Sequence, residues 1–148
     1  MGFALGRKLN SKILVVENQA DDVLLIQQAF KENPDVVLKV VSNPIQALDF
    51  LKRRNAFTSA QRPHLVIIGS GFDNAEQLDM LKEVKEDASL KTIPVIILNS
   101  SDSEQEISEA YSLHANCCVP KPDHADDFNR MLHLIVPYWV TTALLHSM

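Results

Sequence analysis

Glycine, cysteine and tryptophan are scarce in this chain. Four glycines, two cysteines and one tryptophan are present among 148 residues. Cys117 and Cys118 are adjacent, so a disulfide between them would be strained and would close no useful loop. We therefore expect both thiols to stay reduced, as in a cytoplasmic protein. His114 and His124 flank the pair, but successive strand residues face opposite sides of a sheet, which favours packing over a metal site.

The chain also lacks a dense basic block and a long apolar run. Its formal net charge of -5 argues against a nucleic-acid surface or an anionic membrane surface, and favours protein partners. No stretch approaches the length of a membrane span. The first residues lack the apolar core of a secretory signal, and Gly6 stands where a myristoylation signal needs Ser or Thr. We expect residues 1–11 to form a flexible leader.

Short apolar runs alternate with segments of helical periodicity along the rest of the chain. Pro34 ends the first helical segment near Asn33, and Asn43 followed by Pro44 begins the second. Asn18, Asp73 or Asn74, and Ser103 are the other expected helix caps, and residues 55–62 read as a polar loop. The expected strands are Lys12–Glu17, Val36–Val41, Leu65–Ile68, Val95–Leu98 and Cys117–Val119.

This alternation predicts an α/β fold, a doubly wound parallel sheet of five strands with five helices. One domain over residues 12–142 is expected, with a C-terminal helical extension to residue 148. Ligands and chemistry collect at the carboxyl ends of the strands in such sheets. Residues after four of the expected strands should meet at this edge: Glu17, Asn18, Gly69 to Asp73, Asn99 and Lys121.

The chain from Lys12 to about Thr142 resembles a response-regulator receiver domain, with a CheY-like, flavodoxin-like fold. The resemblance rests on residues 13–18, on Ile93-Pro94-Val95 and on residues 115–122. Its spacing is especially similar to that of small single-domain receivers such as the cyanobacterial phytochrome response regulator. The resemblance implies the strand order 2-1-3-4-5 and a place in phosphorelay signalling, with a histidine kinase among the partners.

Most of the functional residues of a receiver are replaced at the matching positions of this chain. The resemblance places Gly69 where the phosphate-accepting aspartate belongs, and Glu17 followed by Asn18 where an acidic pair holds Mg²⁺. It places Asn99 where receivers have the Thr or Ser that responds to phosphorylation, and Cys118 where they have the aromatic residue that changes conformation. Of the functional residues of a receiver, only the lysine is matched, by Lys121. Without the aspartate, Lys121 needs another counter-charge, and we expect it to pair with Glu17 or Asp73.

These replacements predict a pseudo-receiver, a phosphorylation-independent protein-interaction module that is not an enzyme. Acyl-phosphate formation needs a carboxylate nucleophile, which Gly69 cannot supply. We expect no cofactor, and weak or absent Mg²⁺ binding, with Glu17 as a weak candidate ligand. Two alternatives stay open: a conventional phosphorelay receiver using Asp73 as a displaced carboxylate, and an anion or nucleotide sensor at the Gly69–Gly71 turn. Asp73 is also the expected helix cap, and the turn lacks a third glycine.

The C-terminal segment carries more apolar surface than a closing helix needs. Pro137 should interrupt the helix, and Tyr138, Trp139 and Leu144 have the character of binding anchors. The same residues could instead fold back on the core. In receivers of the resembling family the fourth and fifth helices form a dimer face, so the resemblance implies a homodimer through this end.

Overall fold

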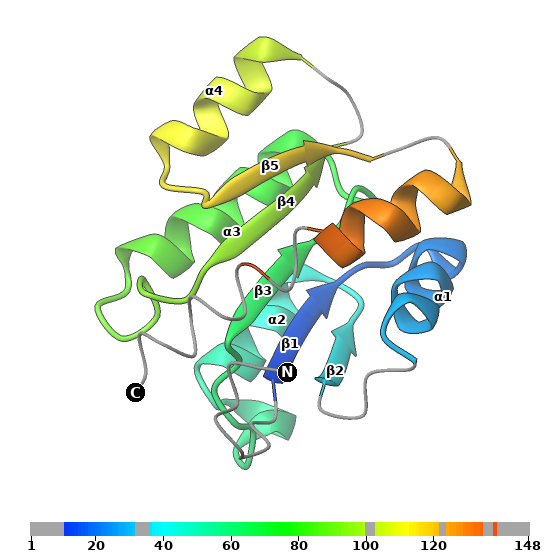
Figure 1. The fold of residues 1–148 in the computed structure, drawn as a ribbon. Helices are drawn as coiled ribbons and strands as arrows, with labels where there is room; N and C mark the ends of the chain where they lie inside the picture. The colour runs from blue at the N-terminus through cyan, green and yellow to red at the C-terminus, as the bar shows by residue number, and fades with distance from the viewer. Residues whose placement is uncertain (1–10, 32–35, 100–102, 122–123, 135–137, 139–148) are drawn as a thin grey trace.

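The computed structural model describes residues 11–31, 36–99, 103–121, 124–134 and 138. Strands and helices alternate along these residues (Figure 1), and a helix over residues 125–134 follows the last strand. Neither this helix nor the others in the described part is long and apolar enough to cross a membrane. The elements are β1 (Ser11–Val16), α1 (Ala20–Ala29), β2 (Val36–Val41), α2 (Pro44–Leu51), the 3₁₀ turn η1 (Asn55–Phe57), β3 (Leu65–Ile68), α3 (Asn74–Glu86), β4 (Val95–Asn99), α4 (Glu104–Ser112) and β5 (Cys117–Pro120).

The five strands form one parallel sheet in the order β2-β1-β3-β4-β5, as the resemblance implied. Val16 of β1 lies beside Ile68 of β3, which lies beside Ile97 of β4. Every residue of β3 and β4 is buried, which explains why both read as unbroken apolar runs.

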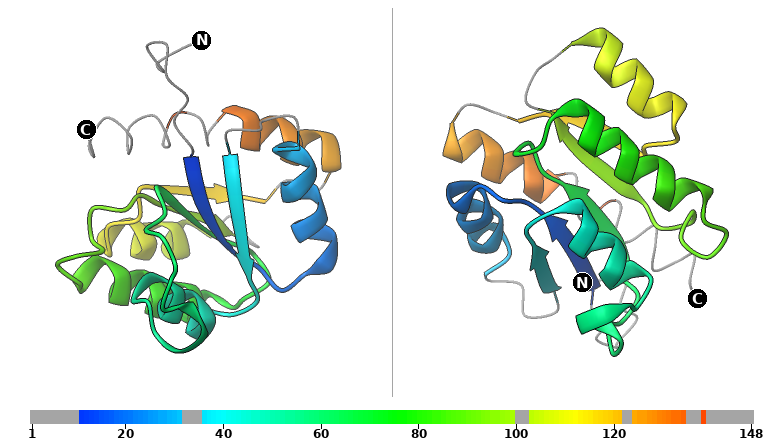
Figure 2. Two further views of the ribbon diagram at one scale, coloured as in Figure 1. Left: turned by 90° about the horizontal axis from the view of Figure 1, so that it is seen from below. Right: turned by 180° about the vertical axis from the view of Figure 1, so that it is seen from behind.

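Helices cover both faces of the sheet. Figure 2 shows α1 and the helix 125–134 on one face, with α2, α3 and α4 on the other. The first face buries Ile26 of α1 and Phe128 of the last helix, and the second buries Ala47, Leu81 and Ala110. This doubly wound arrangement directs every strand's carboxyl end to the same edge.

Three of the four predicted helix caps are present. Asn43 accepts a hydrogen bond from the Gln46 amide at 2.8 Å, and Asp73 forms a capping box with Glu76. Ser103 accepts from the Glu106 amide. The prediction that Asn18 caps the first helix is wrong, because the cap residue is Gln19 and its side chain makes no capping hydrogen bond.

Two predicted element ends were too late in the sequence. Helix α1 ends at Ala29 and not near Asn33. Glu17 lies beyond the end of β1, although its amide still donates to the Val41 carbonyl at 3.0 Å. Its side chain therefore lies at the start of the loop to α1, where it can fold across the sheet edge.

Candidate functional site

The carboxyl edge of the sheet brings the predicted site residues together. Backbone hydrogen bonds extend the strand pairing into this edge, from the Gly69 amide to the Val16 carbonyl at 2.8 Å and from the Lys121 amide to the Asn99 carbonyl at 2.9 Å. Glu17 and Asn99 are both buried, with 2% of their surface exposed, whereas Asn18 is exposed. The edge therefore holds two buried polar side chains beside a residue that has no side chain.

The Glu17 carboxylate folds back over its own loop. Its Oε2 accepts hydrogen bonds from the amides of Asn18, at 2.9 Å, and Gln19, at 3.2 Å. Its Oε1 is buried and accepts no hydrogen bond. Burial raises the pKa of this carboxyl; the two amide hydrogen bonds oppose that shift, nearby Asp22 adds to it and nearby Lys121 lowers it.

Gly69 and Gly71 leave the space that this carboxylate fills. A Cβ atom added at Gly69 would overlap Glu17 Oε1 and lie 2.6 Å from its Cδ. A Cβ atom added at Gly71 would overlap both Glu17 Oε2 and Asn18 Oδ1. Neither glycine has a positive φ, so the backbone conformation does not itself require glycine at either position. The carboxylate of the first loop thus occupies the place where a side chain at position 69 would begin.

A buried amide on α3 joins the ends of β3 and β4. Gln77 Nε2 donates to the Gly69 carbonyl at 2.7 Å and to the Leu98 carbonyl at 3.0 Å. Two adjacent strand ends are therefore held by one side chain. Asn99, the last residue of β4, has a buried Oδ1 that accepts no hydrogen bond.

The expectation that Lys121 pairs with Glu17 or Asp73 is wrong. Lys121 Nζ contacts both carboxylate oxygens of Asp22 on α1, at 2.7 and 2.9 Å. The Asp22 side chain is 5% exposed and that of Lys121 is 33% exposed. This bidentate pair ties the segment after β5 to the first turn of α1 and satisfies the lysine away from Glu17.

Asp73 is an exposed helix cap. Its Oδ1 accepts from the Glu76 amide at 2.8 Å, and its own amide donates to the Glu76 side chain at 3.3 Å.

Cys118 lies within β5, and burial raises the pKa of its thiol to about 11, with a smaller contribution from Cys117. Neither Cys117 nor Cys118 forms a disulfide in the structure.

Among the described residues of this edge, Glu17 is the candidate ligand for a divalent cation, as the sequence predicted. One of its two carboxylate oxygens is already used by backbone amides. In the part of the chain that the structure describes, no group of three or more acidic, histidine or cysteine side chains could hold a metal ion. Cation sites of this kind use one or two carboxylates together with phosphate oxygens and water.

The part of the proposed interaction surface that can be described is small. Tyr138 is 64% exposed, beyond the helix 125–134. Trp139 and Leu144 lie outside the described residues. The homodimer through this end stays a prediction.

Comparison with known protein families gives one match over most of the chain. Residues 13–133 match the model of the response regulator receiver domain. Response regulator Rcp1 of Synechocystis sp. is 29% identical over 134 residues, which cover 90% of this chain and 91% of that protein. The probable methanogenesis regulatory protein FilR2 of Methanothrix harundinacea is 27% identical, over 86% of this chain and 83% of that protein.

The solved structures that are similar to this chain include those of response regulators. The phosphorylated cyanobacterial phytochrome response regulator RcpA superposes with a TM-score of 0.84 and 28% identity, covering 90% of this chain and 96% of that one. The Mn²⁺-bound form of Rcp1 gives a TM-score of 0.81 and 28% identity, covering 88% and 94%.

Proposed function

The chain belongs to the response regulator receiver domain family, and we propose that it is a phosphorylation-independent member, a pseudo-receiver that acts by binding proteins in two-component signalling. The observation that carries the proposal is the Glu17 carboxylate lying where a side chain at position 69 would start. In this chain, which lacks the nucleophile, the Glu17 carboxylate fills the space beside Gly69. A side chain restored at position 69 would have to displace this carboxylate.

Phosphoryl transfer to a receiver needs an in-line carboxylate nucleophile and charge neutralisation of the phosphoryl oxygens. Gly69 has no nucleophilic group, and Lys121 is engaged with Asp22. The Glu17 carboxylate is buried and would repel an incoming phosphoryl group at the strand ends. We expect Mg²⁺ to bind weakly, because Glu17 offers a single oxygen without a hydrogen bond.

The two alternative functions receive less support. Asp73 is held in a capping box at the start of α3, so a role as displaced phosphate acceptor would cost this helix its cap. An anion at the Gly69–Gly71 turn would meet the Glu17 carboxylate, which already fills the space above both glycines. Like charges in a buried site repel strongly, which disfavours an anion sensor here.

Incubation with acetyl phosphate and Mg²⁺, followed by intact-mass measurement, tests the proposal. We expect no added phosphoryl group on this protein, with the cyanobacterial regulator RcpA, whose phosphorylated form has been crystallised, as the positive control. A stable phosphoryl adduct that disappears in Asp73→Ala would support the displaced carboxylate and refute the proposal.

A reconstruction series separates a missing nucleophile from a filled site. Gly69→Asp alone should stay unphosphorylated, because its new side chain overlaps Glu17. Adding Glu17→Asp and Asn18→Asp shortens the obstructing side chain and provides a second carboxylate. We expect phosphorylation only in the triple variant, and efficient phosphorylation of Gly69→Asp alone would contradict the steric argument.

The proposed module transmits its signal by binding, and we expect a histidine kinase or another signalling protein among its partners.

A homodimer through Tyr138, Trp139 and Leu144 is part of this proposal. Light scattering of the wild type and of Trp139→Ala tests it. A wild type that is already monomeric, with a molar mass unchanged in the variant, would refute the dimer.

A further inference from the structure

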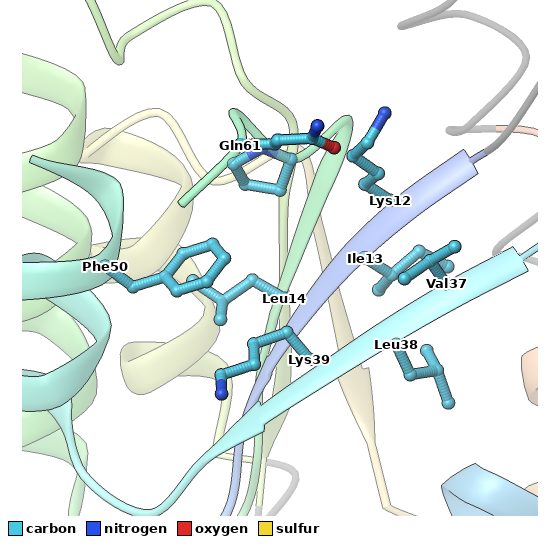
Figure 3. A pocket seen from close by; sticks show the side chains of 9 residues that line it. Lys12, Ile13, Leu14, Val37, Leu38, Lys39, Phe50 and Gln61 are labelled. Atoms are coloured by element: carbon cyan, nitrogen blue, oxygen red, sulfur yellow. The ribbon is translucent and has the colours of Figure 1, made fainter. Parts of the chain in front are cut away.

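A hollow of about 230 Å³ lies on the α2 side of the sheet, near the amino ends of its strands. β1 and β2 form its floor, through Leu14 and Val37, and Phe50 of α2 and Pro63 before β3 form its walls. Figure 3 shows these side chains around the hollow, with Lys12 and Lys39 pointing out at different ends. The carboxyl edge of the sheet, which holds Glu17 and Gly69, lies at the opposite ends of these strands.

The floor of the hollow exposes apolar surface that the fold leaves uncovered. Val37 is 48% exposed, whereas the apolar residue Leu14 beside it is fully buried. Ligand sites are typically apolar hollows with a few placed polar groups, and their volume is usually somewhat larger than this one. The size and lining therefore suit a small molecule with an apolar body.

The polar groups at this hollow include two cations and no acid. Lys12 and Lys39 line it, and neither forms an ion pair with a described carboxylate. Lys39 Nζ instead lies 5.4 Å from the centre of the Phe57 ring. Among the described residues, the hollow thus gathers positive charge without a paired acid in a chain whose net charge is -5.

His64 lies next to Lys12, at the start of β1. His64 Nδ1 accepts a hydrogen bond from the Lys12 amide at 3.0 Å, which places the ring beside the start of β1. Burial lowers the pKa of His64, and the charges of Lys12 and Arg62 lower it further. The described residues that line the hollow include no acid, so an anion there would meet the positive charges of Lys12 and Lys39.

We propose that this hollow binds a small organic acid, with its apolar body against Val37 and Phe50 and its carboxylate at Lys12 or Lys39. Its binding is independent of the carboxyl edge and of phosphorylation. The binding energy comes from covering the exposed floor, and the lysines select an anion over a neutral or cationic molecule of the same size.

Octanoate, kept below its micelle-forming concentration, is the probe, and its binding is followed by amide chemical shifts in the full chain. We expect saturable shifts centred on β1, β2 and the end of α2. Octan-1-ol should bind about fivefold more weakly and octylamine more weakly still, as expected for loss of an exposed ion pair. Binding of octanol as tight as that of octanoate, or shifts without saturation, would overturn the proposal.

Variants separate a specific site from general adsorption. Lys12→Gln/Lys39→Gln should weaken octanoate binding about fivefold, whereas Lys31→Gln/Lys82→Gln, which removes the same charge from exposed positions outside the hollow, should leave it unchanged. Val37→Asp places a carboxylate on the floor and should abolish binding, with Val37→Thr as its size-matched control. Circular dichroism confirms that each variant is folded. Equal effects of the two lysine pairs would refute the proposal.

Discussion

Glu17→Gln should stabilise this protein at neutral pH, although Glu17 is buried and hydrogen-bonded. The side chain is 2% exposed, and Oε1 has no hydrogen-bond partner. An unpaired buried polar atom costs about 1–3 kcal/mol, more when it is charged. Glutamine keeps one oxygen for the amides of Asn18 and Gln19 and places a neutral NH₂ group where the unpaired charged oxygen was. It gives up the charge that strengthens those two hydrogen bonds, a loss of about 1 kcal/mol. The expected net gain is about 1 kcal/mol in the free energy of unfolding.

The pH dependence identifies the cause of this gain. The pKa of Glu17 is raised in the folded state, so below the ordinary value of 4.5 the carboxyl is protonated in both states and carries no penalty. As the pH rises above 4.5, the unfolded chain loses its proton first and the wild type becomes less stable relative to the variant. This loss is complete once the pH has passed the folded-state pKa. The advantage of Glu17→Gln should therefore be near zero at about pH 4 and largest at neutral pH.

Urea denaturation of both proteins at pH 4.0 and pH 7.5 measures this difference. Glu86→Gln is the matched control, because Glu86 lies exposed on α3 and its neutralisation should change stability little at either pH. A less stable Glu17→Gln at pH 7.5 would mean that the amide hydrogen bonds outweigh burial. A gain of equal size at pH 4.0 would show that the effect is one of packing and not of charge.

Three further substitutions test other contacts by the same urea denaturation. Lys121→Met should lower the free energy of unfolding by about 2 kcal/mol, because it leaves the buried Asp22 carboxylate unpaired. Asp22→Asn should lower it by about 1 kcal/mol, because the lysine that it leaves unpaired can reach water. A larger loss in Asp22→Asn than in Lys121→Met would refute this reasoning. Lys85→Met should lower the free energy of unfolding by about 2 kcal/mol, because it removes hydrogen bonds that Lys85 Nζ donates to two backbone carbonyls and to Asn116 Oδ1. An unchanged stability would contradict this. His114→Gly should add about 0.5–1 kcal/mol, since φ is 74° at the end of α4; a loss would refute the strain argument.

The sheet and most helix starts could be predicted because their signals are local. Two unbroken apolar runs identified β3 and β4, and Asp73 was one of the two residues expected to cap α3. The end of α1 was misplaced because the polar sequence before Pro34 does not itself break a helix. Asn18 was misread as a cap because it stands between Glu17 and the helix, and the chain uses Gln19 instead.

The contacts of the site depend on residues far apart in the sequence. Asp22 reads as an ordinary first-turn carboxylate, and its partner Lys121 lies 99 residues away. Gln77 could have been found, because it is spaced four and seven residues from Leu81 and Val84 and therefore shares the buried face of α3. The sequence gives a weaker indication of where the Glu17 side chain lies. This indication is that a long acidic residue in one loop accompanies two glycines in the neighbouring loop, which leave space for it.

The arrangement of the carboxyl edge bears on how such a domain could switch. A ligand shifts an equilibrium between two conformations only by its difference in affinity for them. Here one oxygen of the Glu17 carboxylate accepts hydrogen bonds from the Asn18 and Gln19 amides and Lys121 is paired with Asp22, so both charged groups already have internal partners before any signal arrives. A change of state must then draw its free energy from a partner or ligand that binds elsewhere and favours one conformation. Moving the equilibrium from 1:99 to 99:1 would require about 5.5 kcal/mol of differential binding, which a protein interface can supply more readily than a small acid.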